Sequence, residues 1–336
     1  MKHSYSVVIR TLGNTGEKYL TLLQSIASQT IQPEEIIVVL PYGYSLDHKL
    51  GSERIVYSEK GMITQRAVGI QEAKSEYILV VDDDLQFAPT MIEELFIFVE
   101  KHNLDCCLPM EGTPEKWNTN TIDLRYPFLV RARGAFTGQM FSSHRNSIYL
   151  DKITATAGHK VFLNSNKLDE CYLCETACFQ CFFINTQWAQ SRHFEEAEYL
   201  QEGRLTSYAG YDDPTFFYPL TLKGMRMAYA LRTRYRHLDA SAGHKTRTKL
   251  KDKCIRYYSM GRNRTMFWYF SLWKTSWSIG RKLQVLLGGL YGFTNYTLYT
   301  VVINLHPKYW KAIQCLFMGY YDAFVDIKRI SKKQQD

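Results

Sequence analysis

Short apolar runs alternate with helix-like segments over the first hundred residues. The apolar runs lie at 6–10, 35–40, 54–57 and 77–81. Such runs, bounded by polar residues, are typical of strands that are buried on both faces of a parallel sheet. Between them, residues 20–27 and 65–74 carry apolar side chains at the spacing of an amphipathic helix. The pattern therefore predicts repeated β-α-β units, with a parallel sheet and right-handed crossovers.

The pattern changes after residue 105. Residues 106–202 are irregular, and we expect loops there that shape a pocket. A helix pattern runs from Asp213 to Gly224, and residues 226–230 then predict a short strand at the edge of the sheet. A basic linker is expected over 243–253. The 336 residues can accommodate one large α/β domain and an appended subdomain.

Three consecutive aspartates, Asp82, Asp83 and Asp84, directly follow the apolar run 77–81. Open α/β sheets place their ligand crevice at the carboxyl ends of the strands. Three carboxylates at such a place repel one another unless a cation lies between them. The junction predicts a site for Mg²⁺ or Mn²⁺, held by one or two carboxylates together with substrate phosphates. The alternative is an acidic turn that ends a strand and caps the next helix.

Charge and cysteine usage narrow the class of protein. The net charge of +8 is concentrated from Arg232 onward, which favours an anionic partner such as nucleotide phosphates, anionic lipid or nucleic acid. No nucleic-acid-binding motif accompanies the charge, so nucleic acid is not expected. Because no secretory signal precedes the first strand, we expect a cytoplasmic protein whose eight cysteines are reduced.

Four cysteines, at positions 171, 174, 178 and 181, suggest a zinc site at first sight. Their spacing is more compressed than that of the usual pair of zinc knuckles. At helical spacing all four would lie near one face, where buried thiols behave as small hydrophobic groups. Core packing is therefore the favoured interpretation.

The carboxyl-terminal region combines aromatic and basic residues. Residues 262–274 have the composition of a helix that lies in a membrane interface, with Trp and Tyr at headgroup depth. Residues 283–307 contain no Asp, Glu, Lys or Arg, but polar residues and glycines interrupt them, so a membrane-spanning helix is not favoured. The alternative is a helical subdomain whose aromatic residues pack on the preceding α/β domain.

The order of several short motifs resembles the opening of family 2 glycosyltransferases of the GT-A fold. These motifs are Ser25–Thr30, Pro33, Glu35–Val39, Gly61, Gln65–Ala67, Gly69–Ile70, Ala73 and 77–84. Two later segments add to the resemblance. Gly210–Pro214, followed by Gly224, is similar to the family's acidic pair, and Tyr257–Tyr258 with Arg262–Asn263 is similar to a segment of bacterial rhamnosyltransferase-like members.

The resemblance implies an α/β, Rossmann-like, mostly parallel sheet flanked by helices, with a helical carboxyl-terminal extension. It implies a GT-A catalytic domain over 1–245, with a nucleotide-sugar half at about 1–105 and an acceptor half at about 106–245. A helical, basic and aromatic region would follow at 250–330.

The resemblance also implies roles for individual residues. Asp82 and Asp84 would form the DxD element that binds the metal and the nucleotide-sugar, with His237 as a further metal or phosphate contact. Thr11, Arg66 and Asp83 would contact the nucleotide-sugar. Asp213 would be the general base, and Asp212 stands in place of the usual glutamate. The chain departs from the family after Leu40, where no acidic residue follows until Asp47, so recognition of the base must differ.

These roles suit sugar transfer chemically. A metal ion stabilises the diphosphate that leaves, and a separate carboxylate takes the proton of the attacking hydroxyl. Two separate groups fit a single displacement with inversion and a transition state like an oxocarbenium ion. Each residue also has a plainer interpretation. Asp212–Asp213 can simply begin a helix before Pro214, His237 can be a surface histidine and Arg66 a solvated helix residue.

The resemblance thus implies a metal-dependent, inverting hexosyltransferase (EC 2.4), acting on a hydroxyl of a glycan or lipid-linked acceptor in surface-polysaccharide synthesis. The alternatives are a sugar-nucleotide nucleotidyltransferase, or a non-catalytic GT-A scaffold that binds membrane. Attachment to the inner face of the cell membrane through the carboxyl-terminal region remains a hypothesis.

Overall fold

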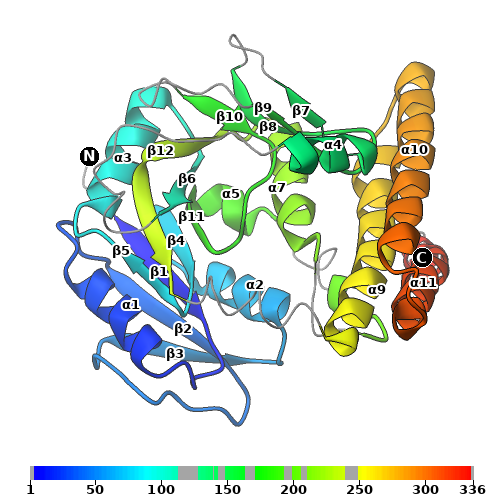
Figure 1. Cartoon of the computed structure of the whole chain (residues 1–336). Coiled ribbons are helices and arrows are strands. Elements are labelled where there is room, and N and C mark those ends of the chain that lie inside the picture. Colours follow the sequence, from blue (N-terminus) through cyan, green and yellow to red (C-terminus); the bar gives the residue numbers. More distant parts are fainter. Residues whose placement is uncertain are drawn as a thin grey trace.

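The computed structural model describes residues 4–112, 128–138, 140–142, 148–162, 171–192, 199–205, 210–238 and 249–333. One mixed sheet forms the centre of the molecule (Figure 1). Its strands are β1 (Tyr5–Arg10), β2 (Glu35–Pro41), β3 (Glu53–Ser58), β4 (Tyr77–Asp82), β5 (Leu85–Phe87), β6 (Cys106–Glu111), β7 (Met140–Ser142), β8 (Tyr149–Ile153), β9 (His159–Phe162), β10 (Tyr172–Cys174), β11 (Cys181–Asn185) and β12 (Met227–His237).

Helices cover both faces of the sheet, and three long ones follow it in the chain. The helices are α1 (Glu17–Ala27), α2 (Met62–Glu72), α3 (Met91–His102), α4 (Phe128–Phe136), α5 (Thr186–Gln190), α7 (Asp212–Leu222), α9 (Leu250–Phe267), α10 (Ile279–Ile303) and α11 (Trp310–Lys333). Shorter helical turns are η2 (Tyr199–Gln201), the π-helical η3 (Trp268–Trp273) and η4 (Pro307–Tyr309).

The first half of the sheet confirms the predicted parallel β-α-β units. Strands run in the order β3-β2-β1-β4, all parallel, and each contains one of the expected apolar runs. Side chains alternate between the two faces, as strand geometry requires. In β4, Leu79 and Val81 pack beneath α1 and α3, whereas Ile78 and Val80 pack against α2, α5 and α7. Burial on both faces explains why these strands are almost wholly apolar.

The second half of the sheet is mixed. β11 runs antiparallel to both β4 and β6, and β12 lies between β6 and β10. The prediction of a short edge strand over 226–230 was wrong, because β12 continues to His237 in the interior of the sheet. In its later half Arg232 and Arg236 are exposed, whereas Thr233, Arg234 and Tyr235 are all buried. The fold is therefore a mixed, mostly parallel α/β sheet with flanking helices and carboxyl-terminal helices, as expected.

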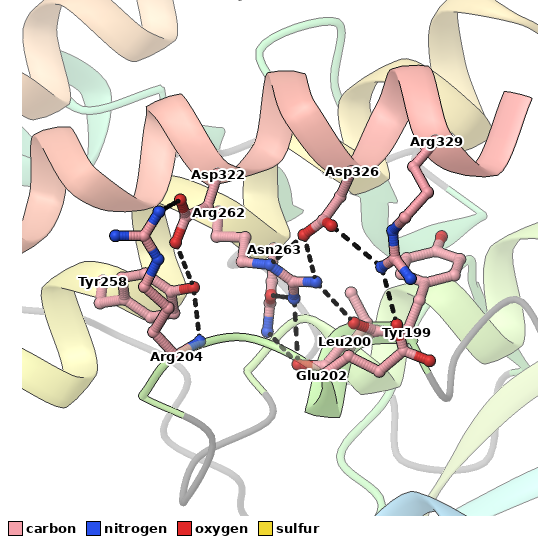
Figure 2. Close-up of polar contacts among 10 residues, drawn as sticks. All are labelled: Tyr199, Leu200, Glu202, Arg204, Tyr258, Arg262, Asn263, Asp322, Asp326 and Arg329. Carbon is pink, nitrogen blue, oxygen red and sulfur yellow. Dashed lines mark hydrogen bonds and ion pairs between the residues drawn. The ribbon is translucent and has the colours of Figure 1, made fainter.

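The first half of the segment 262–274 is buried, up to residue 267. Arg262, Asn263 and Arg264 are buried at the end of α9, and the membrane-interface interpretation of this segment was wrong. Figure 2 shows why the charge is tolerated. The Arg262 guanidinium donates to Asp326 at 2.7 and 2.9 Å and to the carbonyl of Tyr199 at 2.9 Å. A buried charge with a paired carboxylate and carbonyl acceptors avoids the large penalty of an unpaired one.

The same contacts join α9 to α11 and to residues 199–205. The Tyr258 hydroxyl donates to Asp322 at 2.8 Å and accepts from the Arg204 amide (Figure 2). The two helices also approach closely at glycines. A Cβ at Gly319 would lie 2.3 Å from the Tyr258 carbonyl oxygen, and one at Gly261 would lie 2.5 Å from that of Leu316. The helical region is thus packed directly on the sheet domain.

Helix α10 explains the glycines that weakened the helix pattern over 283–307. Gly288, Gly289 and Gly292 all lie on the face that packs inward. A Cβ at these positions would lie 2.6 to 2.8 Å from Ala155, Trp268 and Thr156, so only glycine allows this approach. Among the helices of the described segments, none has the length and apolar character to cross a bilayer.

The four clustered cysteines lie on strands and loops, so the expectation that they share a helix face was wrong. Cys174 and Cys181 are buried on opposite faces of the sheet, in line with core packing. Cys171 is half-buried and Cys178 is exposed. Burial raises the pKa of the Cys174 thiol, as expected for a core residue.

Candidate active site

Asp82 ends β4 and lies beside two arginines. The register places Arg10, the last residue of β1, opposite Asp82. Its Nε lies 3.1 Å from Asp82 Oδ1, and Nη2 of Arg66 lies 3.1 Å from the same oxygen. Asp82 is therefore paired with two guanidinium groups at the carboxyl edge of the parallel strands, and both contacts fall on one of its two oxygens.

Asp83 turns toward the loop after β1. The hydroxyls of Thr11 and Thr15 both donate to its Oδ2, and the Gly13 amide donates to Thr11 Oγ1 at 2.9 Å. Burial raises the pKa of Asp83, although both hydroxyls act in the opposite direction. The predicted nucleotide-binding residues Thr11 and Asp83 are thus brought together.

Asp84 contacts His237 across the sheet. The distance from His237 Nε2 to Asp84 Oδ2 is 3.0 Å. The antiparallel pairing of β5 with β12 creates this contact, because it sets Leu85 opposite His237, and the Leu238 amide donates to the Asp84 carbonyl at 2.8 Å. The hydrogen bond to Asp84 raises the pKa of His237. His237 is therefore a partner of the acidic cluster, although it lies 153 residues after Asp84 in the sequence.

Arg66 connects this cluster to the second acidic pair. It lies on α2 with a buried side chain, and its Nη1 is 3.1 Å from Asp212 Oδ2. The guanidinium also lies 4.6 Å from the centre of the Phe179 ring, a cation–π arrangement. The interpretation of Arg66 as a solvated helix residue was wrong.

Asp212 and Asp213 begin α7, as predicted for a helix start. The preceding residue, Tyr211, has φ 74°, a left-handed conformation that is uncommon outside glycine and clusters at functional sites. The Tyr211 hydroxyl donates to the Ala157 carbonyl at 2.8 Å. From α9, the amide of Asn263 donates to the Gly210 carbonyl at 3.0 Å. The turn that aims the two carboxylates is thus held from both sides.

The two carboxylates have different surroundings. Asp212 is paired with Arg66, whereas Asp213 accepts one hydrogen bond, from the Phe179 amide at 3.1 Å. Burial, followed by the neighbouring charge of Asp212, raises the pKa of Asp213 well above its ordinary value. A carboxylate with a raised pKa and few partners is suited to accept a proton.

Asp213 faces a cavity of about 580 Å³ between the sheet and the carboxyl-terminal helices. Residues from three parts of the chain line it. They include Tyr211 and Tyr229 near the sheet, Arg256, Tyr257 and Arg264 of α9, and Tyr296 and Tyr299 of α10. The cavity is thus rich in tyrosine and arginine, which offer hydroxyl and guanidinium donors together with ring faces.

Sequence reasoning missed Arg10, Tyr211 and the wall formed by α9 and α10. Arg10 had a signal, because a charged residue ended an otherwise apolar run. The tyrosines of α10 had none, since their inward direction depends on how the helix packs. In the described parts of the chain, no group of three or more His, Cys, Asp or Glu side chains is placed to hold a metal ion.

Comparison with known proteins agrees with this fold. Residues 51–168 match the family Glycosyl transferase family 2. A crystal structure of S. aureus TarS is similar, with a TM-score of 0.50 and 15% identity over 91% of this chain and 46% of that chain. A structure of GalNAc-T7 with UDP, GalNAc and Mn²⁺ has a TM-score of 0.46 and 14% identity, over 79% of this chain and 51% of that one.

This chain therefore spans about half the length of these two proteins. No curated protein matches it significantly by sequence. The family match includes the Asp82–Asp84 cluster and ends before Asp212. Over residues 51–168, about a third of the chain, the sequence is thus similar to that of family 2 glycosyl transferases.

Proposed function

We propose that the protein is a metal-dependent, inverting glycosyltransferase that moves a sugar from a nucleotide-sugar donor to a hydroxyl of a glycan or lipid-linked acceptor. One observation carries the proposal. Arg66 bridges the Asp82 cluster and the Asp212–Asp213 pair, and Asp213 faces a cavity large enough for a sugar. A donor site and a proton acceptor thus adjoin one another without being merged, as a single displacement needs.

On the donor side, we assign the nucleotide-sugar to Thr11, Arg66, Asp82 and Asp83. The hydroxyl of Thr11 and the carboxylate of Asp83 form one polar unit at the carboxyl end of β1. Arg66 and Arg10 hold Asp82 in a fixed position next to it. Such groups, fixed before the ligand arrives, lose little freedom on binding.

Asp84 and His237 fit a divalent ion such as Mn²⁺ or Mg²⁺. Both side chains are partly exposed, and an oxygen and a nitrogen donor lie 3.0 Å apart. Asp82 is a third candidate, since its Oδ2 lies outside both arginine pairs. Few protein ligands suffice where phosphate oxygens complete the coordination. A bound ion would supply positive charge beside the departing diphosphate.

On the acceptor side, Asp213 would take the proton from the attacking hydroxyl. Its raised pKa brings proton affinity closer to what a base at neutral pH requires. Asp212 is less suited to act as the base, because its carboxylate is paired with Arg66. We assign Asp212 to hold Arg66 between the two groups. The tyrosine rings of the cavity offer surfaces against which an acceptor sugar can stack.

The test combines donor binding with transfer. Thermal shifts are measured for nucleoside diphosphates and nucleotide sugars, with Mn²⁺ and with chelator, because a ligand specific to the folded state raises the melting temperature. We expect a metal-dependent shift that Asp84→Ala abolishes and Asp213→Asn retains. Asp213→Asn should lose transfer of the sugar to a glycan acceptor. Glu76→Gln serves as the control, since Glu76 is exposed at the opposite end of β4.

Other outcomes would contradict the proposal. If Asp213→Asn keeps full activity on a sugar phosphate and a nucleoside triphosphate, the enzyme is a nucleotidyltransferase. If no nucleotide gives a shift with any metal, the domain is a scaffold without a donor site.

A further inference from the structure

The outer face of α10 is mostly apolar, with Thr294 as an exposed polar residue between Leu290 and Leu298. The exposed residues on this face recur at helical spacing: Leu283, Leu286, Leu287, Leu290, Leu298 and Val302. Trp277, just before the helix, is 94% exposed. The face contains no carboxylate, and the described helix has no acidic residue at any position. A helix face with this many exposed apolar side chains is rare on the free surface of a soluble monomer.

The inner face of α10 is already occupied. The three glycines described above hold it against Ala155, Trp268 and Thr156, and Tyr296 and Tyr299 line the cavity. The outer leucines therefore have no place in the core of this chain's described part. Figure 1 shows α10 at the periphery, with α4 and α9 on its inner side.

Helix α11 repeats the pattern with added positive charge. Its exposed aromatic residues are Trp310, Phe317, Tyr321 and Phe324, and its exposed lysines are Lys311, Lys328 and Lys332. Both acidic residues of α11 are engaged. Asp322 pairs with Arg204 at 2.8 Å, and Asp326 pairs with Arg262 and Arg329 (Figure 2). The exposed face thus offers apolar groups and ammonium groups, without a free carboxylate.

We propose that α10 and α11 dock the protein on the surface of an anionic lipid bilayer. Leucine side chains would enter the acyl boundary, Trp277 and Trp310 would lie at headgroup depth, and the lysines would face anionic headgroups. This surface is distinct from residues 262–267, which are buried.

Charge argues for lipid over a second copy of the chain. In a symmetric dimer the same patch occurs on both partners, so lysines would face a surface that offers them no carboxylate. An anionic bilayer supplies acyl chains for the apolar face and negative headgroups for the lysines.

Tyr299 and Leu298 are neighbours on α10. Tyr299 lines the cavity, and Leu298 is exposed on the outer face. Docking would therefore bring the cavity close to the bilayer, and this part of the inference rests on the proposed function, in which the acceptor can be lipid-linked.

The experiment measures co-sedimentation of the full chain with vesicles of phosphatidylcholine alone and with added phosphatidylglycerol. We expect binding that is stronger with phosphatidylglycerol and weaker at high salt. The triple variant Leu286→Gln, Leu290→Gln, Leu298→Gln should lose binding to both vesicles by at least tenfold, since each leucine leaves water on docking. Lys311→Gln, Lys328→Gln, Lys332→Gln should lower binding to the anionic vesicles by roughly 100-fold and leave the neutral ones unchanged.

Ile97→Gln is the matched control, because Ile97 is an exposed apolar residue on α3, remote in sequence from this surface. Melting temperatures show that each variant is folded. Vesicle binding that the leucine triple variant leaves intact overturns the proposal. A second outcome also overturns the proposal: the wild type is a dimer in sedimentation equilibrium, the leucine triple variant is a monomer, and neither protein binds vesicles. The vesicle experiment contains no nucleotide-sugar donor. A negative result would therefore leave the proposed activity to be tested separately by the nucleotide thermal shifts.

Discussion

The Arg66 guanidinium lies 3.1 Å from Asp82 and 3.1 Å from Asp212, through two different nitrogens. The two carboxylates come from the end of β4 and the start of α7, which are 130 residues apart. One buried cation thus fixes the relative positions of the two acidic groups. Its planar fork suits this task better than a lysine, whose single nitrogen cannot bridge two carboxylates with the same geometry.

Replacing Arg66 with glutamine should destabilise the fold as well as the site. The change leaves two carboxylates without their buried partner, which lowers the free energy of unfolding by about 3 kcal/mol. Denaturant unfolding measures this loss in the free energy of unfolding. Arg10→Gln is the comparison, because Arg10 contacts the same Asp82 oxygen but is partly exposed, and we expect a loss below about 1 kcal/mol. Equal losses for the two variants would show that Arg66 has no special role.

Asp213→Asn should be inactive yet more resistant to unfolding at neutral pH than the wild type. The asparagine oxygen can still accept from the Phe179 amide, so the hydrogen bond is kept. Because the pKa of Asp213 is raised in the folded state, its carboxyl group ionises more easily in the unfolded chain. The free energy of unfolding of the wild type therefore falls as pH rises above the pKa of the unfolded chain. The advantage of the variant should therefore grow from pH 4 to pH 8 in thermal melts. An advantage that is independent of pH would contradict this account.

The pH profile of transfer should reflect the same group. A base works only when ionised, so the acid limb of kcat/KM should lie above pH 4, the usual range of an aspartate. Asp212→Asn removes the charge that is the second cause of the raised pKa. Its residual activity should show an acid limb at lower pH than the wild type, as measured by initial rates at saturating donor. An acid limb at higher pH than in the wild type would show that another residue is the base.

Arg256→Gln should affect the acceptor and spare the donor. Arg256 is an exposed residue of α9 that lines the cavity. Loss of one charged hydrogen-bond donor should raise the acceptor KM about tenfold. The donor KM and the melting temperature should stay the same. A raised donor KM would place the nucleotide, rather than the acceptor, in this cavity.

Gly261→Ala tests how closely α9 and α11 approach. A Cβ there would lie 2.5 Å from a backbone oxygen, so the helices must separate, at a cost of roughly 1–3 kcal/mol in the free energy of unfolding. Gly280→Ala is the matched control on α10, where no atom lies within 4 Å of the added carbon. That change should be neutral or stabilise by up to about 1 kcal/mol, because alanine favours the helix. The measurement is chemical denaturation of both variants.

The sequence predicts best those features that depend on local pattern. The apolar run of β4 and the three aspartates after it determine both a strand and its carboxyl edge, and both lie where expected. The helix start at Asp212 also follows from local chemistry. The pairing of Asp84 with His237 was not visible, because it depends on β5 lying antiparallel to β12. The burial of Arg262 was missed for a similar reason, since its partner Asp326 lies on another helix.

The composite wall of the cavity has a consequence for how such an enzyme can change. The groups assigned to the donor lie on the sheet and on α2, whereas much of the opposite wall lies on α9 and α10. Substitutions at Tyr296 or Tyr299 would reshape one chamber without touching the strands that hold the carboxylates. Acceptor preference could therefore diverge by changes in two helices, while the chemistry of the donor side is inherited unaltered.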